Sequence, residues 1–164
     1  MKIGSRLYGI EPDGLIFMAQ RLESLGFESI WRGEHLAIPK SLANDYPYTK
    51  DGKPPFSVDT PMLDVFTVMM CLAAKTSRIK FSTAICILPL RDILPLERCL
   101  TSIDVLSGGR LMLGVGAGWL KEEFDLLGAD FAHRGAITTE MIQALKAIWL
   151  NHEPEFRGRH ITVA

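Results

Sequence analysis

Apolar and polar positions along the chain follow helical and strand periods in turn. Apolar side chains recur every three or four positions over residues 14–25, which predicts an amphipathic helix with Asp13 as its N-cap and Gly26 at its end. Helices are also predicted at 62–75, 93–106, 120–127 and 135–150. Apolar runs without a helical period predict strands at 3–8, 28–32, 78–88 and 110–115, and the tail predicts a hairpin that turns at Gly158.

This order of strands and helices predicts an α/β fold with about four parallel strands and flanking helices. A (β/α)8 barrel usually needs about 250 residues, whereas this chain has 164. The chain therefore corresponds either to the first half of such a barrel or to a complete small open sheet, and length alone does not decide. The length predicts one domain over residues 1–164.

The charge and the cysteine content of the chain limit the kinds of binding partner that can be expected. The formal net charge of −1 gives no reason to expect nucleic acid or an anionic membrane as a partner. Cys71, Cys86 and Cys99 stand in apolar surroundings without metal-ligand spacing, so we interpret them as reduced core thiols of a cytoplasmic protein. No signal-peptide pattern opens the chain, and no segment reaches the roughly 18 apolar residues of a membrane span.

A long irregular segment, 33–61, follows the second predicted strand. Loops of that length inside compact domains are usually functional or disordered. Glu34 and His35 open the segment, at the strand end where parallel α/β folds gather their active sites. A histidine beside a carboxylate can orient a ligand or move a proton there, and the alternative is a surface histidine without such a role.

Glycines 114, 116 and 118 leave the backbone bare at the end of the fourth predicted strand. A flat ligand could lie against such a backbone, and close packing of strand and helix is the alternative. The dinucleotide fingerprint G-x-G-x-x-G fails here because its last position falls on Trp119 or Lys121.

Other polar groups predict no chemistry from their pattern alone. Residues 121–123, Lys-Glu-Glu, are interpreted as the solvated first turn of a helix. His133, His152 and His160 show no metal-ligand spacing. The strand segment 82–91 is explained by core packing.

Eight short segments, each weak alone, together form a specific pattern through their order and spacing. They are residues 25–31, 34–35, 46–48, 74–79, 87–91, 106–110, 114–119 and 122–124. Over nearly the whole chain this pattern resembles the luciferase-like flavin and deazaflavin monooxygenase family. The Tyr-Pro-Tyr loop around Pro47 and the Gly-Val-Gly-x-Gly-Trp turn are most similar to the branch that uses coenzyme F420, and FMN-dependent members share much of the pattern.

The resemblance implies a (β/α)8 barrel with the flavin or deazaflavin ring at its mouth. By position, His35 matches the active-site histidine of the family, which holds the reactive edge of the ring or moves a proton. Glu34 stands where F420 enzymes commonly carry aspartate. Ala84 and Ile85 match a non-prolyl cis peptide that backs the ring.

The turn beside the ring is matched by Ala117, Gly118 and Trp119. Some relatives place a charged or catalytic side chain in this turn, a role that Ala117 and Trp119 cannot fill. The resemblance thus implies one catalytic residue, His35, and coenzyme F420 as cofactor, with FMN as the alternative.

Family members carry roughly another half barrel, in which barrel phosphate sites are commonly built. A half barrel also exposes two sheet edges. We therefore expect a homo-oligomer or a missing C-terminal half. The first functional hypothesis is an F420- or FMN-dependent oxidoreductase or monooxygenase that acts on an unknown small organic substrate. The second is a catalytically inactive half-barrel fragment or pairing module.

Overall fold

The computed structural model describes residues 1–40, 42 and 46–164, and its backbone forms two compact units. Unit 1 comprises Met1–Glu34, Leu63–Cys86 and Leu94–Val115. Unit 2 comprises His35–Met62, Ile87–Ile93 and Gly116–Ala164. Each unit is built from segments that lie far apart in the sequence.

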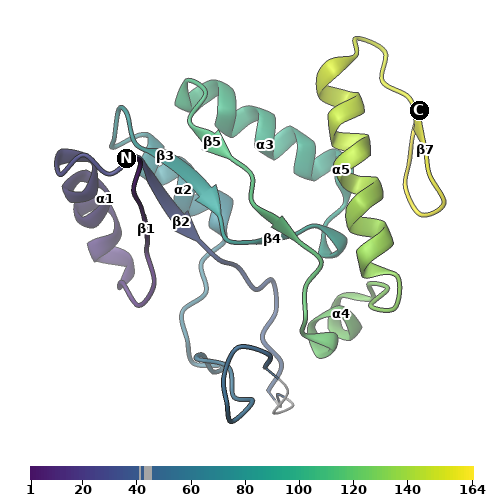
Figure 1. Ribbon diagram of the computed structural model, residues 1–164, viewed down its shortest axis with the longest axis horizontal. Coiled ribbons are helices and arrows are strands. Elements are labelled where there is room, and N and C mark those ends of the chain that lie inside the picture. The colour runs from purple at the N-terminus through teal and green to yellow at the C-terminus, as the bar shows by residue number, and fades with distance from the viewer. Residues whose placement is uncertain (41, 43–45) are drawn as a thin grey trace. The chain divides into compact units, whose positions relative to one another are not determined.

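Unit 1 contains a parallel sheet with the strand order β1-β2-β3-β5 (Figure 1). Its strands are β1 (Gly4–Arg6), β2 (Ser29–Arg32), β3 (Lys80–Thr83) and β5 (Leu111–Met112). The register pairs Ile30 with Phe81 and Phe81 with Leu111. Because all the strands are parallel, their carboxyl ends lie at one edge of the sheet. The predicted parallel α/β fold is confirmed.

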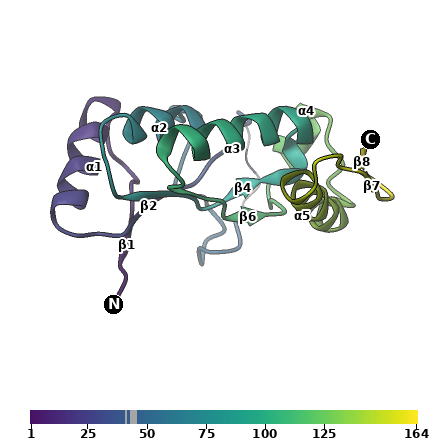
Figure 2. The same cartoon turned by 90° about the horizontal axis from the view of Figure 1, so that it is seen from above.

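Three helices cover one face of this sheet, as Figure 2 shows. They are α1 (Leu15–Ser24), α2 (Val65–Ala73) and α3 (Ile93–Ser107). Placement on one face follows from right-handed crossovers between neighbouring parallel strands. The core of unit 1 is apolar, with Ile30, Phe81, Phe66 and Leu100 all buried.

The start of the first helix differs from the prediction. Asp13 lies inside a 3-10 turn, η1 (Pro12–Gly14), and the N-cap of α1 is Gly14, without a side-chain cap. The predicted Asp13 cap is therefore wrong, because the turn shifts the helix start past it. In α2 the cap is present: the Asp64 carboxylate accepts a hydrogen bond from the Thr67 N–H at 2.8 Å.

Two predicted strands are each divided by a break. The segment 78–88 forms β3, a cis peptide bond between Ala84 and Ile85, the strand β4 (Cys86–Ile87) and a 3-10 turn, η2 (Leu88–Leu90). The segment 110–115 forms β5 and then β6 (Val115–Gly116), which pairs with β4. A periodicity search joins these pieces because the residues at the breaks are themselves apolar or small.

Unit 2 is mainly helical, with α4 (Lys121–Leu127), α5 (Arg134–Leu150) and η2 packed against α5. Leu88, Leu120, Phe124, Met141 and Leu145 form its buried core.

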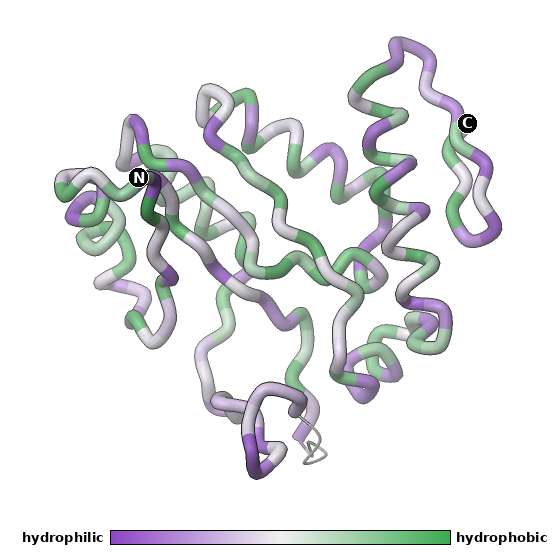
Figure 3. Tube along the Cα trace, viewed as in Figure 1, coloured by the Kyte–Doolittle hydropathy of each residue, from purple (hydrophilic) through white to green (hydrophobic). Residues whose placement is uncertain are grey.

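The C-terminal hairpin of unit 2 pairs β7 (Phe156–Arg157) with β8 (Thr162–Val163) in antiparallel order, as predicted. The Gly158 N–H donates to the Ile161 carbonyl at 2.8 Å and closes the turn, which is the most hydrophilic part of the hairpin (Figure 3).

The three cysteines differ in how far they are exposed to solvent. No disulfide forms among the described residues, and Cys86 is buried and Cys99 half-buried. Cys71 is exposed, so its interpretation as a core thiol is wrong. The reason is that Cys71 lies on the outer side of a helix that is apolar on nearly every side. Among the described residues, no helix combines the length and apolar character needed to cross a membrane.

Candidate functional site

The segments that follow β1, β2 and β3 lie together at the carboxyl edge of the sheet in unit 1. A Cβ atom added at Gly33 would lie 2.8 Å from the Ala84 carbonyl oxygen and 3.0 Å from the Tyr8 hydroxyl. A side chain at position 33 would thus collide with its neighbours. The glycine lets the segments after these strands lie in direct contact.

The backbone around the Ala84–Ile85 cis peptide is held on both sides. The Ala84 N–H donates to the Arg32 carbonyl at 2.7 Å, and the Cys86 N–H donates to the Gly114 carbonyl at 2.8 Å. Ala84 itself is half-buried, and Ile85 is 39% exposed. The cis geometry expected from the resemblance is confirmed at these residues. Their contact with a cofactor ring stays a prediction.

The predicted site residues are divided between the two units. Glu34, Ala84 and Ile85 belong to unit 1, whereas His35, Ala117, Gly118 and Trp119 belong to unit 2. Glu34 is buried and is the last residue of the first segment of unit 1, and His35, the next residue in the chain, begins unit 2.

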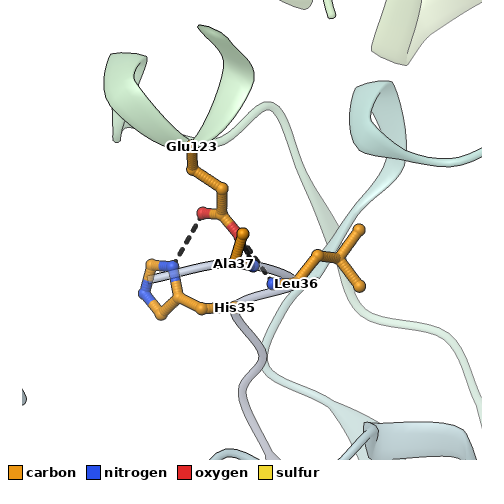
Figure 4. A network of polar contacts seen from close by, with 4 residues as sticks. All are labelled: His35, Leu36, Ala37 and Glu123. Atoms are coloured by element: carbon orange, nitrogen blue, oxygen red, sulfur yellow. Dashed lines mark hydrogen bonds and ion pairs between the residues drawn. The ribbon is translucent and has the colours of Figure 1, made fainter. Parts of the chain in front are cut away.

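His35 is held by a carboxylate that lies far away in the sequence (Figure 4). His35 Nδ1 lies 2.8 Å from Glu123 Oε2, and the backbone N–H groups of Leu36 and Ala37 donate to Glu123 Oε1 at 2.6 and 3.2 Å. The side chains of His35 and Glu123 are 8% and 1% exposed. One buried carboxylate therefore fixes both the ring and the backbone that carries it.

This arrangement determines which nitrogen of His35 carries the proton when the ring is neutral. An ionised carboxylate can only accept, so Nδ1 must donate to Glu123. Within the described part of the chain, no hydrogen-bond partner reaches Nε2. Nε2 is therefore the ring nitrogen left for a further hydrogen bond, as an acceptor when the ring is neutral and as a donor when it is protonated.

The interpretation of residues 121–123 as a solvated turn is wrong for Glu123, which is fully buried. Leu120, Glu123 and Phe124 occupy positions i, i+3 and i+4 and are all buried, so the glutamate lies on the apolar side of α4. The position of a glutamate within the apolar stripe of this helix was the sequence signal that could have indicated its burial. Its partner could not be found locally, because 88 residues separate Glu123 from His35.

Aromatic rings surround His35 within unit 2. The ring centroids of His35 and Phe56 are 4.5 Å apart, and those of His35 and Trp119 are 6.2 Å apart in an edge-on arrangement. Tyr46 packs against Trp119 at 4.9 Å and against Tyr48 at 5.4 Å. The structure thus brings the predicted residues His35 and Trp119 together. It adds Phe56, which the sequence pattern did not single out.

The turn at Gly118 sets the position of Trp119. Gly118 has a φ of +81°, and a Cβ atom there would lie 2.8 Å from both Ile87 and Phe124. The Arg134 Nε–H donates to the Gly118 carbonyl at 3.1 Å, and the Arg134 guanidinium stacks on Phe131 at 3.8 Å. The tight turn places Trp119 against the ring of His35.

The family model for luciferase-like monooxygenases matches residues 2–164. The chain belongs to this family. Membership agrees with the cis peptide after β3 and with the buried histidine that follows the unit 1 sheet.

Curated relatives are similar over most of this chain. The uncharacterised protein Rv0940c of Mycobacterium tuberculosis is 30% identical over 86% of this chain and 49% of its own length. A pyrimidine monooxygenase, RutA, of a Bradyrhizobium strain is 37% identical over 60% of this chain and 28% of its own length. The chain thus spans at most about half the length of these relatives.

Solved structures of similar fold cover 99% of the chain. The monooxygenase RslO1 of Streptomyces bottropensis has a TM-score of 0.79 at 21% identity and is covered over 47%. The FMN complex of the oxygenating constituent of 3,6-diketocamphane monooxygenase from Pseudomonas putida has a TM-score of 0.74 at 18% identity and is covered over 43%. The F420-dependent tetrahydromethanopterin reductase of Methanopyrus kandleri has a TM-score of 0.72 at 20% identity and is covered over 44%. These likenesses show the shared fold, and the coverage is that of half a (β/α)8 barrel.

Proposed function

We propose that this chain is the cofactor-ring-binding half of a luciferase-like oxidoreductase that uses coenzyme F420, with FMN as the alternative, on a small organic substrate. The observation that carries the proposal is the buried His35–Glu123 pair, whose geometry leaves Nε2 of the histidine open. A buried and oriented imidazole costs conformational freedom, and ligand binding is the use that explains it.

Each unit, taken by itself, offers groups that suit a planar redox ring. The cis peptide carries a half-buried Ala84 and an exposed Ile85, which offer an apolar surface for the face of a ring. His35 offers Nε2 to a polar ring edge. A bound flavin or deazaflavin supplies the hydride transfer or the oxygen chemistry, and the chain supplies orientation and exclusion of water.

In this proposal each site residue has a separate task. Glu123 holds the proton on Nδ1, so that His35 Nε2 accepts a hydrogen bond from the ring or moves a proton at its edge. Phe56 and Trp119 pack on the imidazole and keep water from it. Glu34 contacts the ring or the substrate as the carboxylate next to His35.

The choice of F420 over FMN rests on the tyrosines of the Tyr-Pro-Tyr loop and on Trp119, the part of the pattern most similar to F420-dependent members. Tyr46 stacks edge-on against Trp119, which links these two features in unit 2. Solved relatives include one bound to FMN and one described as F420-dependent, so both cofactors belong in the test.

A second candidate is a half barrel that pairs with another chain and has no turnover of its own. The outer strands of the unit 1 sheet are β1 and β5, and such edges favour pairing with further chain. A homo-oligomer or a separate C-terminal half would supply the partner.

Fluorescence titration of the purified chain with F420 and with FMN separates the two candidates. The enzyme proposal predicts saturable binding of one cofactor and at least about tenfold weaker binding in His35→Ala, since a hydrogen bond is lost. His152→Ala is the matched control, because His152 is exposed and outside the site. Absence of binding by both cofactors at high micromolar concentration contradicts the enzyme proposal and supports the pairing module. Light scattering adds the oligomeric state, and a monomer with one cooperative melt would contradict the expectation of a partner.

A further inference from the structure

A half-buried arginine without a carboxylate partner lies at the carboxyl edge of the sheet. The side chain of Arg32, the last residue of β2, makes one hydrogen bond within the described residues, from Nη1 to the Leu7 carbonyl at 3.1 Å. Its Nε is fully buried and has no hydrogen-bond partner among the described residues. The N–H groups on Nη2 also find no acceptor in the described part of the chain. The guanidinium is thus held in place by one hydrogen bond, and its Nε–H is buried without an acceptor among the described residues.

A second arginine, Arg6, lies at the carboxyl end of the neighbouring strand β1. The guanidinium carbon of Arg6 lies 5.7 Å above the ring of Tyr8. Within the described residues, neither Arg6 nor Arg32 forms an ion pair with a carboxylate. Burial lowers the pKa of Arg32, and an ionised Tyr8 would act in the opposite direction. A charge withdrawn from water without a partner is costly, so an outside anion would be strongly favoured there.

These residues lie on the same edge as the cis peptide. The Tyr8 hydroxyl would lie 3.0 Å from a Cβ atom at Gly33, and the Ala84 carbonyl would lie 2.8 Å from it. Tyr8 is 54% exposed and so can contact a ligand. The edge therefore combines guanidinium and phenol donors with the apolar surface of Ile85, all within unit 1.

We propose that Arg32, assisted by Tyr8, binds an anionic oxygen group of the bound small molecule, and that this group is a carboxylate of the substrate. A guanidinium binds a carboxylate through two parallel N–H groups, which an ammonium cannot reproduce. Barrel phosphate sites commonly follow strands 7 and 8, so an anion site next to β1 and β2 favours the substrate over the cofactor phosphate. The assignment to a substrate rests on the proposed function, whereas the anion site itself does not.

The direct test follows the side-chain Nε–H signal of Arg32 by NMR during titration of the whole chain with benzoate. Arg32→Lys assigns the signal by its loss. We expect a saturable shift with benzoate and none with benzamide, its neutral analogue. Calorimetry with Arg32→Gln and Arg32→Lys should show at least about tenfold weaker benzoate binding, because charge-assisted hydrogen bonds are lost. Arg21→Gln, which removes an exposed guanidinium on α1, should bind benzoate like the original chain.

Absence of a saturable benzoate shift, or an equal shift with benzamide, would overturn the anion site. Equal benzoate affinities of Arg21→Gln and Arg32→Gln would overturn the anion site as well. The near-ultraviolet circular dichroism of each variant verifies that the fold is retained. If Arg32→Gln does not fold, benzoate binding is compared with Arg32→Lys instead, because lysine keeps the positive charge and a long side chain.

The source of the anion is tested with FMN and riboflavin, which differ only in the phosphate. Unchanged binding of both flavins to Arg32→Gln supports the substrate carboxylate. Weaker FMN binding with unchanged riboflavin binding assigns the anion to the cofactor and overturns the substrate assignment. If neither flavin nor F420 binds while benzoate does, the proposed function fails and the anion site stands.

Discussion

Two glutamates of unit 2 hold distant segments in the same way but with different consequences. Glu123 in α4 accepts from the N–H groups of Leu36 and Ala37 and from His35. Among the described residues, Glu140 in α5 accepts from backbone N–H groups of the hairpin turn alone, those of residues 159, 160 and 161. Both carboxylates sit on a helix and fix a loop by its backbone, and only one of them also holds a titratable ring.

Burial separates these two cases. Glu123 is fully buried, whereas Glu140 is half-exposed. The pKa of Glu140 is lowered mainly because the His160 N–H donates to it, with further help from the N–H groups of Ile161 and Arg159. A carboxylate near water anchors a turn at little cost, and a buried one must satisfy every oxygen inside the protein. The additional histidine at Glu123 is the feature on which the proposed site rests, whereas Glu140 anchors the hairpin turn.

Glu123→Ala should have the largest effect on stability. It removes the acceptor of two backbone N–H groups and of the imidazole, and we expect a loss of about 2–4 kcal/mol in the free energy of unfolding. Urea denaturation measures this loss. Asp125→Ala on the same helix is the control, because its ion pair with Lys121 is exposed and should contribute little. Equal losses in the two variants would contradict the distinction between buried and exposed carboxylates.

Gly118→Ala should be the next most destabilising change. The added Cβ meets Ile87 and Phe124 at 2.8 Å and has to adopt a φ of +81°. We expect a loss of about 2–3 kcal/mol, which combines the backbone strain with the collision. Gly108→Ala isolates the strain, because Gly108 has a φ of +71° and open space around its Cβ position, and should cost about 1 kcal/mol. Thermal denaturation of both variants measures the difference between their losses of stability. Equal losses would contradict a role of the Gly118 turn in packing α4.

Glu123→Gln should affect the proton position more than the stability. The amide oxygen can still accept from Leu36 and Ala37, which places the amide NH2 against His35 Nδ1. Since that group donates, Nδ1 becomes an acceptor and the neutral ring moves its proton to Nε2. Nitrogen-15 NMR of the imidazole should report this tautomer change, with about 1 kcal/mol of destabilisation. An unchanged tautomer would show that Glu123 does not determine the protonation of His35.

Glu140→Gln should have the smallest effect, confined to the hairpin and dependent on pH. The folded pKa of Glu140 lies below the ordinary value of 4.5, so its contribution is complete above that pH and is lost as the pH falls toward the folded pKa. The Gln variant should therefore show a shallower loss of stability as the pH falls below 4.5. Hydrogen exchange of the His160 and Ile161 amides measures it locally. Identical pH profiles in the two proteins would contradict the anchor.

Much of the site was predictable because its signals are local or follow a family pattern. His35 and Trp119 are brought together as expected, and the cis peptide lies at Ala84–Ile85. Glu123 was missed since its role depends on a contact across 88 residues. The Asp13 cap failed because the choice between a 3-10 turn and an α-helical start depends on how the preceding loop leaves the sheet.

The amino-acid pattern alone was sufficient for the order of helices and strands, the parallel pairing and the closing hairpin, because periodicity and turn residues act over a few neighbours. Folding in three dimensions decided which polar groups are buried and paired. Glu123 became the holder of His35, and Arg32 was left without a carboxylate among the described residues. Desolvation and hydrogen-bond partners depend on segments that are distant along the chain, and no local pattern encodes them.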